Sequence, residues 1–229
     1  MTQAEPTEPI SAATVVLVRD GPDGLEVLML RRGETRVFGG MWVFPGGRVD
    51  PEDFPPGSPD DLGAATRTAA VREAEEEVGL TVDGDAMVPL SHWLPPPIAP
   101  KRNSTWFFLA PAPEGTVVVD GGEIHHHEWL TPREIFRRHA AGEIDLAPPT
   151  WVTLHQLGEH ADVAAAVAEA AARDPIPFFE THMAKVGDRL LAMWIDDAGY
   201  DAGDPEAPGA RHRLYMDKGG WTYERSGSP

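Results

Sequence analysis

The sequence predicts an α/β fold, because strand-like and helix-like segments alternate along it. Two apolar runs, "ATVVLVRD" and "LEVLMLRR", flank the turn sequence "GPDG" and indicate a β-hairpin. Residues 64–78, "AATRTAAVREAEEEV", consist of good helix formers and are followed by Gly79 as a stop. A second helix over 132–141 is predicted to begin after the capping residue Thr131, with Pro132 in its first position.

The remaining elements follow from local chemistry. After the hairpin, "MWVFPGG" predicts a third short strand, and the proline-, glycine- and aspartate-rich residues 50–63 predict a loop. Further strands are predicted at 86–93, 104–110, 115–119 and 123–130, and further helices at 149–158 and 161–173. Two hairpins that turn at 186–188 and 218–220 complete the chain.

Composition places the chain among globular proteins and excludes several functions. Apolar residues make up 41% and charged residues 24% of its 229 residues, enough for one core domain and an extension. The net charge of −18 predicts repulsion of nucleic acid and of anionic membranes. Without cysteine there is no disulfide, thiolate metal site or cysteine nucleophile. The sequence shows neither the pattern of a signal peptide nor an apolar run long enough for a transmembrane helix, so we expect a cytoplasmic protein.

The stretch "REAEEEVGL" at 72–80 crowds four glutamates into five positions, although neighbouring like charges on a helix repel. At about 100° per residue, Glu73, Glu76 and Glu77 fall on one arc of the predicted helix, separate from the small apolar residues. Taken alone, the cluster is explained by a solvated acidic face. Its alternative is a site for Mg²⁺ or Mn²⁺, which prefer carboxylate oxygens.

The glycine pair at 46–47 followed by "REAEEEVGL" resembles the Nudix box. The resemblance implies an α/β/α sandwich with a mixed sheet, the box helix on one face and the 132–141 helix on the other. It also implies hydrolysis of a diphosphate with Mg²⁺ or Mn²⁺ held by Glu73, Glu76, Glu77 and the Gly46 carbonyl. Glu76, Glu77 and Glu123 are the alternatives for the catalytic base, and Glu123 is also a candidate metal ligand.

One feature departs from the family pattern. The box usually has five residues between its glycine and a glutamate, and seven residues between that glutamate and its arginine. With seven residues in between, the position before Arg72 is Ala64, which is no glutamate, and the loop after Gly47 is longer than usual. Because the missing glutamate is mainly structural in the family, its absence questions how the helix is anchored.

"FGGMWVFPGGRVDPEDF" and "PPPIAPKRNSTWFFLA" resemble the branch of the family that includes peroxisomal-type coenzyme A diphosphatases. This resemblance implies coenzyme A or an acyl-coenzyme A as the small-molecule substrate. The alternatives are an ADP-ribose or NADH diphosphatase, or a non-catalytic ligand-sensing module. We expect the chain to divide into a flexible tail at 1–10, a Nudix domain at 11–145 and a C-terminal helical and β-hairpin extension at 146–229, which the resemblance does not cover, packed on that domain. Family habit adds the expectation of a homodimer.

Other candidates lie outside the box. Glu128 competes with Glu123 as a late acidic group, and three successive histidines, His125 to His127, alternate faces on a strand and so do not suit one metal ion. Basic residues near the expected phosphate site are candidate substrate ligands, because arginine binds phosphate through a bidentate fork. They are Arg31, Arg32, Lys101 and Arg102.

Overall fold

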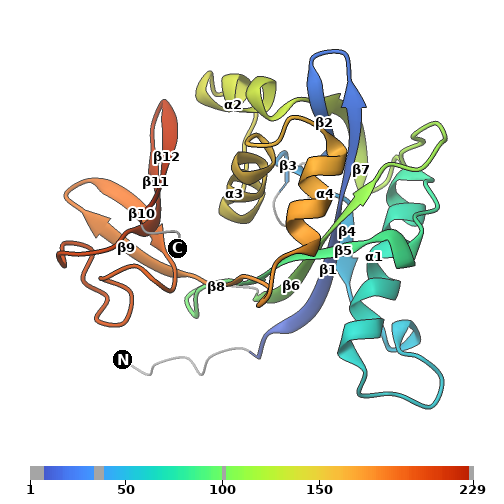
Figure 1. The fold of residues 1–229 in the computed structure, drawn as a ribbon, viewed down its shortest axis with the longest axis horizontal. Helices are drawn as coiled ribbons and strands as arrows, with labels where there is room; N and C mark the ends of the chain where they lie inside the picture. Colours follow the sequence, from blue (N-terminus) through green and yellow to red (C-terminus); the bar gives the residue numbers. More distant parts are fainter. Residues whose placement is uncertain (1–7, 34–38, 100–101, 227–229) are drawn as a thin grey trace.

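The computed structural model describes residues 8–33, 39–99 and 102–226 (Figure 1). Its main β-sheet contains β1 (Ile10–Gly21), β2 (Gly24–Arg32), β3 (Trp42–Val43), β4 (Gly46–Arg48), β5 (Val88–Leu94), β6 (Asn103–Pro111), β7 (Ile124–Leu130) and β8 (Phe178–Glu180). The helices are α1 (Leu62–Val78), α2 (Pro132–Ala140), α3 (Pro148–Leu157) and α4 (Val163–Ala171), with short 3-10 turns at Pro51–Asp53 and Gly84–Ala86. A second sheet comprises β9 (His182–Val186), β10 (Arg189–Met193), β11 (His212–Asp217) and β12 (Gly220–Arg225).

The main sheet is mixed, as predicted. Its strand order is β3-β2-β1-β6-β5-β8, with β4 paired to β1 and β7 paired to β2. The β1/β6 and β5/β8 pairs are parallel, and the other pairs are antiparallel. The predicted hairpin of β1 and β2 forms around "GPDG". Ile10, which the sequence assigned to the tail, already begins β1, and residues 1–7 lie outside the described part of the chain.

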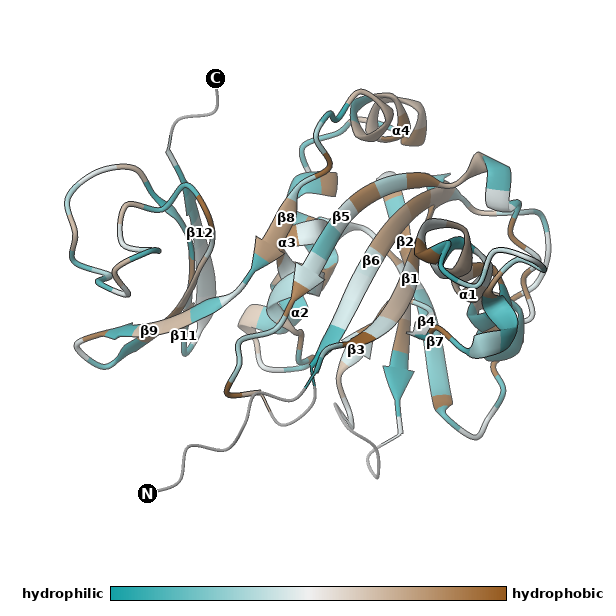
Figure 2. Cartoon of the chain, turned by 90° about the horizontal axis from the view of Figure 1, so that it is seen from below, coloured by the Kyte–Doolittle hydropathy of each residue, from teal (hydrophilic) through white to brown (hydrophobic). Residues whose placement is uncertain are grey.

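Helices cover both faces of this sheet, which confirms the α/β/α sandwich. Successive residues of β1 point to opposite faces, so Val15 and Leu17 pack with α1 whereas Val16 and Val18 belong to the core beneath the other helices. Side chains of α2, α3 and α4 close that second core, and α4 is largely apolar along its length (Figure 2). One face of α1 is therefore packed on the sheet, and the side chains of its other face are available to form a site.

The predicted third strand is split in two. Trp42–Val43 pairs with β2, whereas Gly46–Arg48 pairs with β1, and the chain changes partner at Phe44 and Pro45. Gly46 lies so close to β1 that a Cβ atom there would come within 2.5 Å of the Ala13 carbonyl oxygen. The glycine pair thus brings backbone next to the sheet and beneath α1.

The predicted strand at 115–119 is wrong. Its β-branched residues instead pack beside the end of α1, where Val117 and Val119 contact the core. The Val118 N–H donates to the Val78 carbonyl (3.0 Å) and the Asp120 N–H donates to the Glu77 carbonyl (3.3 Å). Because the last carbonyls of a helix lack partners within it, this segment satisfies α1 rather than a sheet.

The two C-terminal hairpins form as predicted and make the second, antiparallel sheet. Aromatic side chains join the sheets: Trp93 stacks on Phe179 of β8 at 3.9 Å between ring centroids and meets Trp194 edge-on at 5.7 Å. The boundary between residues 145 and 146 stays a prediction. None of the described helices is long and apolar enough to cross a membrane.

Candidate active site

Helix α1 divides its side chains between the core and the expected site. Its small residues, including Ala70 and Ala74, are fully buried against the sheet, which lets the helix axis approach the strands closely. Asp61 caps the start by accepting from the Ala64 N–H (3.0 Å), and Gly79 ends the helix in the left-handed conformation at φ 67°. The position of α1 relative to the sheet is therefore fixed, and with it the direction in which the glutamate side chains extend toward β4.

The side chain of Glu77 extends from α1 to β4 and is only 7% exposed. Its Oε2 accepts a hydrogen bond from the Gly46 N–H at 3.0 Å. Burial raises its pKa to about 7, and repulsion from Glu73 and Glu123 acts in the same direction, whereas the Gly46 hydrogen bond and Arg32 oppose the rise. Glu77 is thus a carboxyl group that titrates near neutral pH in the protein without bound cations.

Glu73 lies one turn earlier, with its carboxylate against Gly47, where a Cβ atom would overlap it. Burial raises the pKa of Glu73, and repulsion from Glu76 and Glu123 adds to this rise while Arg72 opposes it. Glu73, Glu77 and Glu123 are therefore close enough to sense one another's charge. The helical period predicted that Glu73, Glu76 and Glu77 lie on one arc of the helix. In the structure Glu76 differs from the other two, because its side chain is 59% exposed.

Replacing Gly47 with alanine is expected to displace the Glu73 carboxylate and to lower turnover about tenfold, on the scale expected when a functional side chain is moved by about 1 Å. Gly63 in α1 provides the matched control, because a Cβ atom there would lie an ordinary 3.6 Å from Asp61 and alanine favours helix. Gly63→Ala should leave turnover unchanged. Equal turnover in the two variants would contradict the placement of Glu73.

Arg72 anchors the glutamates to the loop before α1. It donates to both carboxylate oxygens of Asp53 at 3.0 Å, and also to Glu73 (2.9 Å) and Glu76 (3.1 Å). The Asp53 side chain is 1% exposed. Although burial alone would raise its pKa, the hydrogen bonds from Arg72 and the Asp50 N–H hold that pKa below its ordinary value.

Asp53 was missed by the sequence interpretation, and it removes the doubt about helix anchoring. With seven residues in between, the position before Arg72 is Ala64, but with five residues in between, the position after Gly47 is Asp53. The extra residues of the loop lie between Asp53 and Arg72, and the Asp53 carboxylate still pairs with Arg72 although the two are far apart in the sequence.

Glu123 begins the turn into β7 on the opposite side of the site. Asp120 fixes this turn because its carboxylate accepts from the Glu123 N–H (2.9 Å) and the Ile124 N–H (2.8 Å). The competing Glu128 pairs with Arg138 of α2 at 2.9 Å. The structure thus brings Glu123, rather than Glu128, to the glutamates of α1.

The predicted basic ligands lie in different environments. Arg32, at the end of β2, contacts Glu77 (3.6 Å) and Glu123 (3.3 Å), whereas Arg31 is exposed on the same strand. Arg102 is buried and donates to the Pro95 carbonyl (3.2 Å), which secures the loop before β6. Lys101 lies outside the described residues. Substrate contacts by these groups stay predictions.

The sequence matches the model of the NUDIX domain over residues 9–150. The chain belongs to the Nudix family. Among solved structures it is similar to a NUDIX hydrolase from Alicyclobacillus acidocaldarius, with 26% identity, a TM-score of 0.63, and coverage of 71% of this chain and 96% of that one. The family and this neighbour identify the chain as a hydrolase that acts on pyrophosphate bonds.

A second similar structure is the NUDIX domain of Shewanella oneidensis NrtR complexed with ADP ribose. It has 16% identity, a TM-score of 0.51, and coverage of 67% of this chain and 88% of that one, so the likeness shows the Nudix fold alone. None of the curated proteins compared with the chain matches it.

The Nudix carboxylates have the chemistry that a divalent cation needs, since oxygen ligands suit Mg²⁺ and Mn²⁺. Within residues 8–33, 39–99 and 102–226, no three acidic or histidine side chains are gathered closely enough for one ion. A cationic nitrogen of Arg32 instead lies among the Gly46 carbonyl, Glu77 and Glu123 oxygens. These three oxygens already accommodate positive charge, so the residues fit the expected ion.

The histidines do not join this site. His126 contacts Glu128 (3.2 Å) and meets Trp42 in a T-shaped arrangement, and the His125 ring packs against Gly33.

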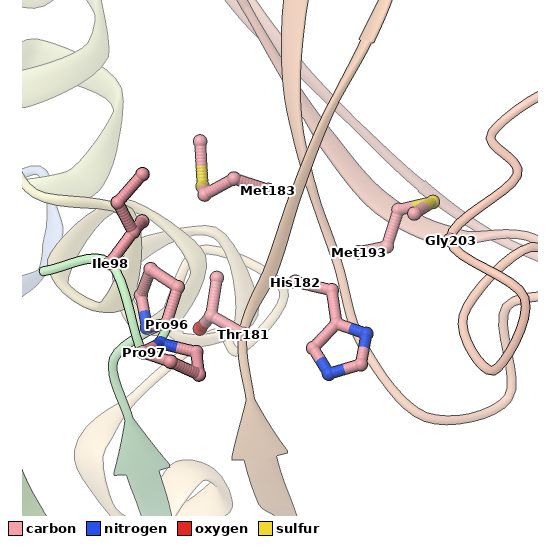
Figure 3. Close-up of a pocket in the computed structure, with 8 residues that line it drawn as sticks. All are labelled: Pro96, Pro97, Ile98, Thr181, His182, Met183, Met193 and Gly203. Atoms are coloured by element: carbon pink, nitrogen blue, oxygen red, sulfur yellow. The ribbon is translucent and has the colours of Figure 1, made fainter. Parts of the chain in front are cut away.

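An apolar hollow of about 300 Å³ lies elsewhere, between the loop after β5 and the second sheet (Figure 3). Its polar side chains have partners of their own: Thr181 accepts from the Trp194 indole at 3.0 Å, and His182 lies 3.1 Å from the Tyr200 carbonyl. None of the described residues that line it is acidic, so the hollow does not offer the ligands of a cation-dependent hydrolase.

Proposed function

We propose that the protein is a Mg²⁺- or Mn²⁺-dependent diphosphatase that acts on a nucleoside-diphosphate-linked metabolite. The observation that carries this proposal is the convergence of Glu77, Glu123 and the Gly46 carbonyl around one positive charge. Glu73, which lies against Gly47, and Glu76, whose side chain is exposed, complete the proposed set of metal ligands.

In this proposal the protein supplies ligands and a proton acceptor. Glu73, Glu77 and the Gly46 carbonyl, together with Glu123 just before β7, would hold the cation that binds the diphosphate. When bound, the cation supplies charge that neutralises the phosphate oxygens and increases the acidity of water. Glu76, Glu77 and Glu123 are the alternatives for the base, because each is a carboxylate that could accept the proton of the attacking water.

For the substrate we propose coenzyme A or an acyl-coenzyme A, on the two sequence motifs around Gly46 and before Trp106. ADP-ribose or NADH is the alternative, and the Shewanella domain, which is complexed with ADP ribose, supports the first of these two. The sensing module is less favoured than an enzyme, because Asp53 supplies the carboxylate whose apparent absence suggested it.

A hydrolysis assay tests the proposal with coenzyme A, acyl-coenzyme A, ADP-ribose, NADH and diadenosine polyphosphates, each with Mg²⁺, with Mn²⁺ and with chelator. We expect cation-dependent cleavage of a diphosphate bond, with coenzyme A compounds cleaved fastest. Product identification by mass spectrometry assigns the bond. Binding without cleavage across the panel would favour the sensing module.

Divalent cations are also expected to stabilise the folded chain. At a hundredfold excess over Kd, a ligand of the native state adds about 2.7 kcal/mol, which corresponds to an increase in Tm of about 5–10 °C for a chain of this size. The increase should disappear with chelator and shrink when Glu77 is changed to glutamine. An identical response of parent and variant to Mg²⁺ would contradict the ligand assignment.

A further inference from the structure

Arg32 places one guanidinium nitrogen among oxygens from three separate segments. Its Nη2 lies 3.4 Å from the Gly46 carbonyl oxygen of β4, 3.6 Å from Glu77 Oε1 of α1 and 3.3 Å from Glu123 Oε1 beside β7. These three groups are also the proposed cation ligands. The guanidinium therefore lies at their meeting point.

We propose that Arg32 acts as an internal cation: it holds these ligands together in the metal-free protein and leaves them when a divalent ion binds. The inference rests on the proposed function. Two positive groups within a few ångströms of each other repel strongly in a partly buried site. Binding of an ion by Gly46, Glu77 and Glu123 therefore requires the guanidinium to move.

The contacts of Arg32 are suited to such an exchange. Charge-assisted hydrogen bonds between nitrogen and oxygen usually measure about 2.7–2.9 Å, and the contacts of Arg32 with Gly46, Glu77 and Glu123 are longer, at 3.3–3.6 Å. Its Nε is buried and has no hydrogen-bond partner among the described residues. Arg72 differs, because it forms a two-bond fork with Asp53. Arg32 is thus held mainly by electrostatic attraction to the carboxylates. A divalent ion carries twice its charge and attracts the same carboxylates more strongly.

Displacement would also give Arg32 its predicted function. The residue ends β2 at the edge of the site and keeps its charge at all physiological pH values. Once released from the carboxylates, its planar fork matches the oxygens of a phosphate. The Arg32 side chain then contacts the oxygens of the metal ligands before the ion binds and those of the substrate afterwards. The ion must therefore bind before Arg32 can contact the substrate.

Replacing Arg32 with glutamine tests this exchange, measured by calorimetric titration with Mg²⁺ or Mn²⁺ alone. We expect the variant to bind the ion at least about tenfold more tightly than the parent, while its activity falls because a phosphate contact is lost. Arg19→Gln is the matched control, since Arg19 pairs with Glu26 on the surface, and it should leave the affinity unchanged. Unchanged or weaker binding by Arg32→Gln, with a parent that binds, would overturn the inference alone. A parent that binds neither ion would overturn the proposed function too.

A second measurement uses the unaltered chain and does not depend on how a variant folds. Phenylglyoxal modifies accessible arginine side chains, and peptide mapping reports the rate at each position. Arg32 should react several-fold faster with saturating Mg²⁺ than with chelator. Arg213, fully buried in a pair with Asp197, should show no change. Equal or slower modification of Arg32 with Mg²⁺ would overturn the proposed displacement.

Discussion

Replacing Glu77 with glutamine is expected to lower turnover at least about 10²-fold, the scale of a lost metal ligand or general base. Glutamine retains the shape of the side chain and can still accept from the Gly46 N–H, which now measures 3.0 Å to Oε2. It cannot carry the negative charge or accept a proton. The loss of activity would therefore report chemistry at this carboxylate rather than collapse of the loop.

The same substitution is expected to change how stability depends on pH. Burial raises the pKa of Glu77 from 4.5 to about 7 in the folded protein. Its stabilising contribution is thus fully present below pH 4.5, where the group is protonated, and is lost as pH rises through about 7. At about 1.4 kcal/mol per pKa unit, the loss is on the order of 3 kcal/mol, and Glu77→Gln should remove it.

Both effects are measured against Glu75→Gln, which makes the same chemical change at an exposed position of α1. Turnover is compared at saturating Mg²⁺, and denaturant unfolding is followed from pH 4.5 to pH 8 in chelator. The control should match the parent in both measurements. Near-parent turnover of Glu77→Gln would exclude the residue from catalysis, and parallel pH curves would contradict the effect of burial.

Elements with local signals could be predicted from the sequence. The box helix, expected at 64–78, forms at Leu62–Val78, and both C-terminal hairpins turn where glycine allows it. The segment "GTVVV" at 115–119 shows why propensity alone fails. Its β-branched residues favour a strand, but the carbonyls at the end of α1 compete for its backbone N–H groups, and this competition is visible only in three dimensions.

The candidate site was predictable where it depends on the helical period and not where it depends on long-range pairing. The period places Glu73 and Glu77 on neighbouring turns, and the structure brings Glu123 to them through the turn that Asp120 fixes. No spacing rule indicated that Arg32 would lie between carboxylates from two other segments. Its environment depends on the register of β2 against β7, which shifts between Arg31 and Arg32.

Replacing Asp53 with asparagine is expected to destabilise the protein by about 3 kcal/mol, the scale for breaking a buried ion pair. The variant keeps the size of the side chain but loses the charge and one acceptor of its fork with Arg72. Since the folded pKa of Asp53 lies below its ordinary 3.8, its contribution is present above that pH and is lost as pH falls below it. The difference in unfolding free energy between parent and variant should therefore be full at pH 7 and shrink below pH 4.

Turnover of Asp53→Asn is expected to fall about tenfold although Asp53 has no proposed contact with the substrate, because Arg72 connects it to Glu73 and Glu76. Asp53→Glu, which keeps the charge, should restore part of both stability and turnover, and Glu52→Gln provides a control at the exposed neighbouring position. A merely structural role would lower stability while leaving kcat and the affinity for Mg²⁺ unchanged in the folded fraction. A fall in kcat and in Mg²⁺ affinity, measured below the unfolding temperature, would instead establish that Asp53 positions the glutamates through Arg72.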